Sequence, residues 1–131
     1  MCIFCQITSG EIPVEAIFED EDLFVFLDNN PVNPGHCLII PKQHYENIEE
    51  TPVDILQKIV AVAKEIGGKI KNNLGYSAYN LIVNNGVAAD QEMMHTHWHL
   101  VPRLEKGELG VAKKSVYQEG EKEEILKKLK N

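Results

Sequence analysis

Apolar and polar positions in the first part of the chain predict three short β-strands. Residues Glu15–Glu19 and Leu23–Leu27 combine branched and aromatic side chains, and the acidic turn Asp20–Asp22 joins them. The run Cys37–Ile40 is apolar without interruption and stops at Pro41, a pattern typical of a buried strand. The chain therefore begins with elements suited to a sheet.

A helix is predicted from Thr51 onward, because Thr is a favourable N-cap and Pro52 fits a first turn. Apolar residues then recur at near-helical spacing and form one stripe, at Ile55, Ile59, Val62, Ile66 and Ile70. The segment Asn72–Gly75 ends this helix. A short second helix is predicted over Gly120–Lys130, where two acid–base pairs lie four residues apart: Glu123 with Lys127 and Glu124 with Lys128.

Two more strands are predicted at Asn80–Val83 and Met94–Val101, with the polar loop Asn84–Glu92 between them. The strands surround one main helix without a regular alternation of strand and helix. This order favours an α+β fold with an antiparallel sheet. The chain shows no repeat and no linker, so one domain is expected over residues 1–131.

Composition narrows the function classes. Hydrophobic residues make up 44% of the chain and charged residues 25%, as in soluble globular proteins. Acids exceed bases by 20 − 13 = 7, which argues against binding a nucleic-acid backbone but allows a local pocket for one nucleotide. No segment has the length of a membrane span or the pattern of a signal peptide, so we expect no membrane partner and a cytoplasmic location.

The segment His95–His99 contains three of the five histidines. In a strand, His95, His97 and His99 would share one face, with neighbouring histidines roughly 7 Å apart, whereas a helix would scatter them. One alternative is a chance cluster on a polar sheet face. Another is a catalytic zinc shared by the three rings, although rings in a row on a flat strand reach one metal poorly.

The pattern His-X-His-X-His followed by two apolar residues resembles the signature of the histidine triad (HIT) family of nucleotide-binding proteins. Other segments match the family in order and approximate spacing: Cys2–Cys5, Glu11–Pro13, Asp28, Pro34–His36, Ile40–His44, Asn80–Gly86 and Gln91. The resemblance covers residues 2–103, leaves 104–131 as a C-terminal tail, and is strongest to zinc-containing bacterial members of the Hint-type branch. It implies a HIT-like fold, with a five-stranded antiparallel sheet, one main helix and short helices, and with the sheet extended across a homodimer.

The resemblance also implies catalytic roles. His97 corresponds to the nucleophile, which attacks the α-phosphate and forms a nucleotidyl-histidine that water then hydrolyses. A backbone carbonyl of the motif strand is expected to hold its other ring nitrogen. His99 and His36 correspond to the remaining active-site histidines. They would stabilise charge on the phosphate oxygens, or His99 would protonate the leaving group.

Nucleotide-binding positions follow from the same resemblance. Asp28 corresponds to the ribose-binding carboxylate, although by itself it reads as the start of the turn Asn29–Gly35. Asn84 and Gln91 correspond to phosphate-contacting amides. Four apolar residues correspond to the base pocket, although each also suits an ordinary core: Ile3, Phe4, Ile12 and Phe26.

The loop before the triad departs from the family pattern at two positions. Asp90 stands where the family commonly has Gly, and Glu92 stands where eukaryotic Hint-type members have a Ser that contacts the phosphate or leaving group. A carboxylate near phosphate would repel it. These departures therefore bear on activity and leaving-group preference more than on the fold.

The pair Cys2 and Cys5 has the spacing of a zinc site, of a redox pair or of unpaired structural thiols. A redox pair of this spacing is typical of a βαβ unit, which the predicted elements do not contain. In the zinc-bearing branch that the chain resembles, His44 and His95 complete the ligand set. The resemblance thus implies one structural zinc per chain, while Cys37 in its apolar strand is expected to be a buried free thiol.

These observations predict an enzyme that cleaves at the α-phosphate of purine nucleoside phosphoramidates or related nucleotides, with AMP as a representative ligand. Two other functions remain open. One is a zinc-dependent hydrolase that uses the triad as metal ligands, and the other is a nucleotide-binding regulatory module with little catalysis.

Overall fold

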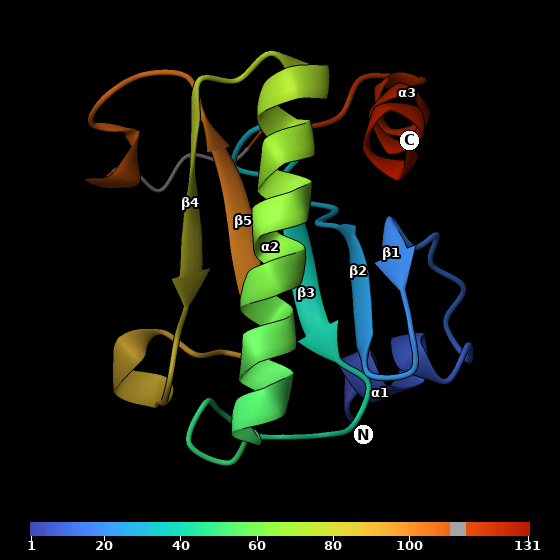
Figure 1. The fold of residues 1–131 in the computed structure, drawn as a ribbon, viewed down its shortest axis with the longest axis vertical. Helices are drawn as coiled ribbons and strands as arrows, with labels where there is room; N and C mark the ends of the chain where they lie inside the picture. The colour runs from blue at the N-terminus through green and yellow to red at the C-terminus, as the bar shows by residue number, and fades with distance from the viewer. Residues whose placement is uncertain (111–114) are drawn as a thin grey trace.

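The computed structural model describes residues 1–110 and 115–131, so residues 111–114 of the predicted C-terminal tail lie outside the description. Its centre is a five-stranded antiparallel sheet with the order β1-β2-β3-β5-β4 (Figure 1). The strands are β1 (Phe18–Glu19), β2 (Leu23–Leu27), β3 (Cys37–Pro41), β4 (Ala78–Val83) and β5 (Trp98–Arg103). The helices are α1 (Ile3–Thr8), α2 (Val53–Leu74), η1 (Val87–Ala89), η2 (Glu108–Gly110) and α3 (Glu121–Lys130). The predicted α+β fold with an antiparallel sheet is confirmed.

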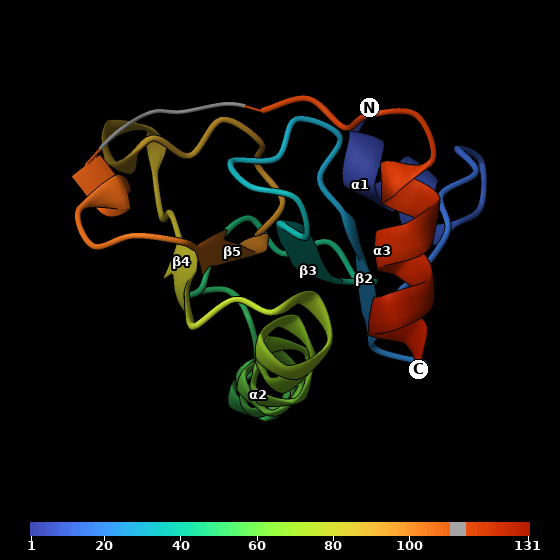
Figure 2. The same cartoon turned by 90° about the horizontal axis from the view of Figure 1, so that it is seen from above.

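Both faces of β2 and β3 are covered, which explains why these strands are apolar throughout. Alternate residues pack toward α2, among them Leu23, Val25, Leu27, Cys37 and Ile39. The residues between them pack toward α1, which contributes Phe4 and Ile7; these are Phe24, Phe26, Leu38 and Ile40. Figure 2 shows α2 on one side of the sheet and α1 on the other.

The predicted apolar stripe of α2 is buried against the sheet. Its N-cap is Pro52 rather than Thr51, because the Thr51 hydroxyl donates to the Asn47 carbonyl at 2.8 Å instead of capping the helix. Gly75 ends the helix with a φ of 80°, a left-handed conformation that favours glycine. Within the helix, a Cβ at Gly67 would lie 2.3 Å from the Tyr79 ring, so this glycine allows β4 to approach.

Two predicted strands begin later in the chain than their sequence patterns indicate. The strand at Glu15–Glu19 is reduced to β1, since Phe18 and Glu19 alone are paired with β2. The strand Met94–Val101 begins only at Trp98. The Thr96 N–H is donated to the Tyr45 carbonyl at 2.7 Å, outside the sheet ladder, and this bond draws the preceding segment away from β3.

The C-terminal helix α3 lies at the β1–β2 side of the sheet (Figures 1 and 2). Its buried residues Ile125, Leu126 and Leu129 join the core on the α2 side. Of its two predicted ion pairs, Glu124–Lys128 is present with the N and O atoms 3.6 Å apart. Glu123 has no ion-pair partner among the described residues. In the described ranges, no helix combines the length and the apolar character that crossing a membrane requires.

Candidate functional site

His97 lies immediately before β5 and is held by the backbone. Its Nδ1 is 2.9 Å from the carbonyl oxygen of His95. A ring nitrogen that faces a carbonyl carries the hydrogen, so Nδ1–H donates and Nε2 keeps its lone pair. The Phe4 ring of α1 packs against the His97 ring with centroids 5.0 Å apart. Orientation and tautomer of this imidazole are therefore both set by its surroundings.

A hydrogen-bonded pair of histidines lies beside His97. His36 Nε2 on the loop before β3 is 2.9 Å from His99 Nδ1 on β5. The backbone N–H of Val32 donates to His36 Nδ1 at 3.1 Å. For a neutral pair, His36 thus carries its hydrogen on Nε2 and donates to His99, which leaves the His99 hydrogen on Nε2. The His99 ring centroid is 5.1 Å from that of His97.

Asp28 follows β2 and adjoins this pair. One carboxylate oxygen accepts the Asn30 N–H at 2.8 Å, which forms the turn that its sequence context predicts. The other oxygen lies 3.7 Å from His36 Nε2. The Asp28 backbone N–H donates to the His36 carbonyl at 2.9 Å, so the two ends of the loop 28–36 are tied together. Asp28 and His36 are thereby brought to the same place.

The predicted base-pocket residues lie around one cavity, with one exception. Ile3, Ile12 and Phe26 line a cavity of about 340 Å³ between α1, the end of β2 and α3, whereas Phe4 is buried in the core and packs on the histidines. Asn29, the neighbour of Asp28, lines the same cavity. Its size lies within the range of small-ligand pockets, roughly 300–1,000 Å³.

The loop between β4 and β5 does not place Gln91 as its sequence position suggests. The Gln91 side chain is buried, its Nε2 donates to the Glu46 and Met93 carbonyls, and its Oε1 accepts the Gly86 N–H. With both amide hydrogens donated to the backbone, Gln91 holds the loop rather than offering a donor to phosphate. The predicted phosphate contact of Gln91 is therefore not supported. Asn84 donates once, to the Asp90 carbonyl at 3.4 Å, and is half-exposed.

Four side chains converge at the N-terminal end of α1. Cys2 Sγ is 3.3 Å from His95 Nδ1, and Cys5 Sγ is 3.4 Å from His44 Nδ1. One ligand atom of each residue lies within 4.8 Å of the others. Two thiols and two imidazoles match the ligand types and number of a structural zinc site. The four residues fit the metal.

His95 is prepared for this role by a backbone contact. Its Nε2 is 2.8 Å from the Pro41 carbonyl, so Nε2–H donates and the lone pair on Nδ1 faces the cysteines. Burial lowers the pKa of His95, which favours the neutral ring that a metal requires. Burial raises the pKa of Cys5, and the neighbouring Cys2 raises it further.

The structure divides the three triad histidines between two groups of contacts. His95 lies against the cysteines, whereas His99 is bonded to His36 and its ring packs against the ring of His97. Residues 95–97 precede β5, so His99 alone of the three lies within the strand, although the Phe4 ring packs against both His95 and His97. Among the described residues the three rings do not form a common ligand group, so the structure does not support a zinc held by the triad.

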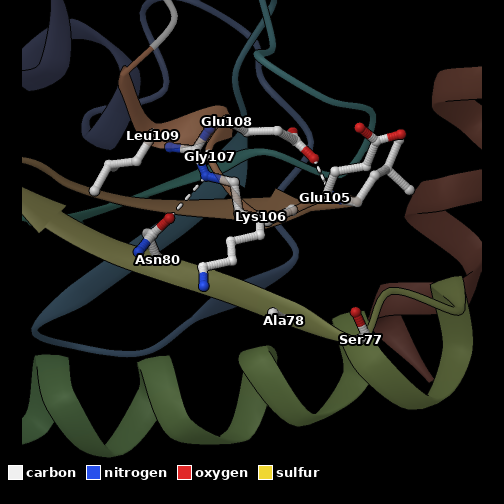
Figure 3. A pocket seen from close by; sticks show the side chains of 10 residues that line it. Ser77, Ala78, Asn80, Glu105, Lys106, Gly107, Glu108 and Leu109 are labelled. Carbon is white, nitrogen blue, oxygen red and sulfur yellow. Dashed lines mark hydrogen bonds between the residues drawn. The ribbon is translucent and has the colours of Figure 1, made fainter.

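A second cavity, of about 350 Å³, lies where β4 begins and β5 ends (Figure 3). Asn80 and Arg103 line it, and Arg103 Nε donates to Asn80 Oδ1 at 2.7 Å. Its lining contains none of the five histidines. The lining of the cavity beside Asn29 contains no histidine either, but Asn29 follows Asp28, whose carboxylate lies 3.7 Å from His36 Nε2.

Fold and site together define a small α+β protein with a network of three histidines, a cavity beside the Asp28 loop, and a cluster of two cysteines and two histidines that could hold a metal ion. Residues 9–106 match the family model of the HIT domain. The chain belongs to the HIT family, as its sequence motifs predict.

Several relatives are similar over most of this chain. An uncharacterized HIT-like protein of Methanocaldococcus jannaschii is 43% identical over 130 residues, 99% of each chain. An adenylylsulfatase, HINT3 of Arabidopsis thaliana, is 43% identical over 80% of this chain and 53% of its own length. The adenosine 5'-monophosphoramidase HNT1 of Saccharomyces cerevisiae is 37% identical over 80% of this chain and 64% of its own length.

A zinc-bound histidine triad protein of Mycobacterium smegmatis is similar in structure. It superposes with a TM-score of 0.84 and 32% identity, covering 98% of this chain and 92% of that one. The similarity confirms the HIT fold over nearly the whole chain.

Proposed function

We propose that this protein is a nucleotide hydrolase that cleaves at the α-phosphate of purine nucleoside phosphoramidates and related nucleotides. The observation that carries the proposal is the bond from His97 Nδ1–H to the His95 carbonyl. In the neutral ring, this bond places the hydrogen on Nδ1 and leaves the Nε2 lone pair for nucleophilic attack. The names of the yeast and plant relatives, an adenosine phosphoramidase and an adenylylsulfatase, support the same class of substrate.

In the first step, His97 Nε2 attacks the α-phosphorus. An N–P bond forms, and the bond from phosphorus to the leaving amine or oxygen breaks. An amine leaving group takes up one proton as it departs. The His99 Nε2–H, directed by the bond from His36, is the donor placed beside His97 to supply that proton or to stabilise the charge on the phosphate oxygens.

In the second step, water attacks the phosphorus of the nucleotidyl-histidine from the side opposite His97. The N–P bond breaks, the lone pair returns to Nε2, and the proton lost by water passes to the surrounding histidines or to solvent. The products are a nucleoside monophosphate and free enzyme. Splitting the displacement in two is the general advantage of covalent catalysis.

Asp28 is proposed to hold the ribose. Its carboxylate lies beside the His36 ring, and the next residue, Asn29, lines the cavity together with Ile3 and Phe26. A carboxylate accepts hydrogen bonds from both ribose hydroxyls at once. This arrangement orients the base toward the cavity and the α-phosphate toward His97. Asn84 remains a candidate phosphate contact through the amide hydrogen that it does not donate to Asp90.

Cys2, Cys5, His44 and His95 are the proposed ligands of one structural zinc. Bound there, the metal supplies cross-linking of the N-terminal helix to the segment before β5. Because the His95 carbonyl accepts the His97 hydrogen bond, fixing His95 also fixes the nucleophile.

A homodimer is proposed through the edge strand β4. This strand is the last in the sheet order, and Ala78 and Leu81 are exposed on it. Val60 on α2 is an exposed apolar residue as well. An edge with apolar side chains pairs readily with a second copy. Analytical ultracentrifugation of the protein and of Leu81→Lys tests this, with the wild type expected at twice the chain mass of 14.8 kDa.

Steady-state hydrolysis of adenosine 5'-phosphoramidate tests the proposed activity. Wild type should release AMP and amine, and His97→Ala should lose at least about a hundredfold in rate, equivalent to roughly 3 kcal/mol in the chemical step. The control is Lys64→Ala on the exposed face of α2, which should leave the rate unchanged. Nucleotide binding with no turnover in wild type would instead favour a binding module.

A further inference from the structure

The helix α3 forms one wall of the cavity beside Asp28. Lys122, Glu123 and Leu126 of this helix line the cavity, opposite Ile3 and Ile12. Leu126 is also buried in the core, which fixes the helix against the sheet. The HIT domain match ends at residue 106, so this wall comes from a part of the chain outside it. The C-terminal tail thus contributes side chains to the proposed nucleoside site.

Both ends of α3 are tied to other walls of the same cavity. Lys122 Nζ donates to Asn29 Oδ1 at 2.6 Å, and Lys130 Nζ pairs with a Glu15 carboxylate oxygen at 2.6 Å. Asn29 and Glu15 are themselves lining residues. The helix is therefore positioned by the residues that surround the cavity, and it stands beside the end of β2 (Figure 2).

The lining separates into an apolar part and a polar part. Ile3, Ile12 and Phe26 supply apolar surface suited to the faces of a purine ring. Lys122 and Glu123 supply a donor and an acceptor from consecutive positions of α3. Glu123 is exposed and has no hydrogen bond or ion pair within the described residues, whereas its neighbour Glu124 pairs with Lys128. Its carboxylate is available to a ligand.

We propose that Glu123 and Lys122 read the edge of the bound base and favour guanine over adenine. This inference rests on the proposed function, because it concerns the same nucleotide site. The Glu123 carboxylate accepts hydrogen bonds from guanine N1–H and from the N2 amino group. The Lys122 ammonium donates to guanine O6.

Adenine offers a poorer match to this pair. Its N1 is an acceptor, so a carboxylate facing N1 meets a lone pair instead of a hydrogen. Adenine also lacks both the N2 amino group and O6. A site with fixed hydrogen-bonding groups rejects a ligand that leaves them unpaired.

Calorimetric titration of wild type with GMP, IMP and AMP measures this preference. Hypoxanthine in IMP keeps N1–H and O6 but lacks the N2 amino group, so it isolates one hydrogen bond. We expect affinity in the order GMP, IMP, AMP, with GMP about tenfold tighter than AMP, the factor that one charge-assisted hydrogen bond supplies. Equal affinities, or AMP the tightest, would overturn the inference.

Two variants locate the effect. Glu123→Gln removes the charge at the cavity and should reduce the GMP-to-AMP preference at least about threefold, while AMP affinity changes little. Glu124→Gln removes the same charge from the adjacent position, which lines no part of this cavity, and should keep the wild-type preference. An equal preference in wild type and Glu123→Gln would overturn the role of Glu123.

Failure of the proposed function gives a different result. A wild-type protein that binds none of the three nucleotides, although folded by circular dichroism, contradicts the nucleotide site itself. A protein that binds all three and hydrolyses the phosphoramidates without regard to base retains the proposed function and contradicts only the reading of the base by α3.

Discussion

His36 Nε2 and His99 Nδ1 are 2.9 Å apart and form a hydrogen bond whose direction is fixed when both rings are neutral. The direction is set by the Val32 N–H, which occupies His36 Nδ1 as a donor. It leaves the His99 hydrogen on Nε2, the nitrogen not engaged by His36. In the proposed mechanism, this relationship makes His97 the nucleophile, His99 the donor and His36 the residue that positions the donor.

Replacing His99 should therefore act through the leaving group. His99→Ala should slow phosphoramidate hydrolysis by about a hundredfold or more, because an amine requires a proton to depart. An acyl adenylate, whose leaving group is a stable carboxylate, should lose less than about tenfold. The ratio of kcat/KM values for the two substrates is the measurement. Equal losses on both would assign His99 to charge stabilisation at the phosphate oxygens instead.

Metal content should depend on the cysteines and not on the nucleophile. Purified wild type and His97→Ala should each hold about one zinc per chain, whereas Cys5→Ser should hold little, because a structural site needs its four ligands. Elemental analysis of the three proteins is the measurement, with Cys37→Ser as the matched cysteine control. A loss of zinc in His97→Ala with retention in Cys5→Ser would move the metal to the triad.

Ribose recognition should depend on Asp28. Asp28→Ala should weaken AMP binding about tenfold to a hundredfold, as expected for losing charge-assisted hydrogen bonds of roughly 1.5–3 kcal/mol. The 2',3'-dideoxy analogue should bind wild type poorly and lose little more in the variant. Calorimetry on protein shown to be folded measures both ligands. Equal weakening of both would leave Asp28 as a turn residue only.

Cys37 should be unreactive in the native protein. Its side chain is fully buried in β3, and burial raises its pKa to about 12, so the thiolate is scarce at neutral pH. After zinc removal, a thiol reagent at pH 8 should label Cys2 and Cys5 in folded protein and Cys37 only in denaturant. Rapid labelling of Cys37 without denaturant would contradict the burial.

The same burial gives a pH dependence. A thiol whose folded pKa lies above its ordinary value of 9.0 contributes full stability below that pH and loses it as pH rises toward 12. Relative to Cys37→Ala, wild type should therefore become less stable above pH 9, measured as urea midpoints across that range. A constant difference between the two proteins would contradict the shift.

Much of the fold follows from local patterns. The strands β2 and β3 can be recognised because they are buried and almost entirely apolar along their length. The helix α2 can be recognised because its buried apolar residues recur at helical spacing. The helix α1 is missed because its residues Ile3–Thr8 form little more than one turn, with no stripe long enough to show a period. It is stabilised instead by packing of Phe4 and Ile7 on distant strands.

The site residues differ in how far sequence can place them. His95 looks like a member of one strand face, yet tertiary hydrogen bonds to Pro41 and Tyr45 hold its segment outside β5. Gln91 looks available to a ligand, and three backbone partners occupy it. The unusual Asp90 is explained by its φ of 66°, the left-handed conformation that Gly adopts most easily and Asp tolerates. Nothing in the tail predicts that α3 reaches the cavity.

The central claim is that His97 forms a covalent bond to the α-phosphorus. Intact-mass spectrometry of wild type, quenched in acid-free buffer during turnover of adenosine 5'-phosphoramidate, tests it most directly. The account predicts a species heavier by one adenylyl group that is absent in His97→Ala and present in Lys64→Ala. Substrate turnover with no adduct in wild type under rapid quench, or an adduct of equal abundance in His97→Ala, would contradict it.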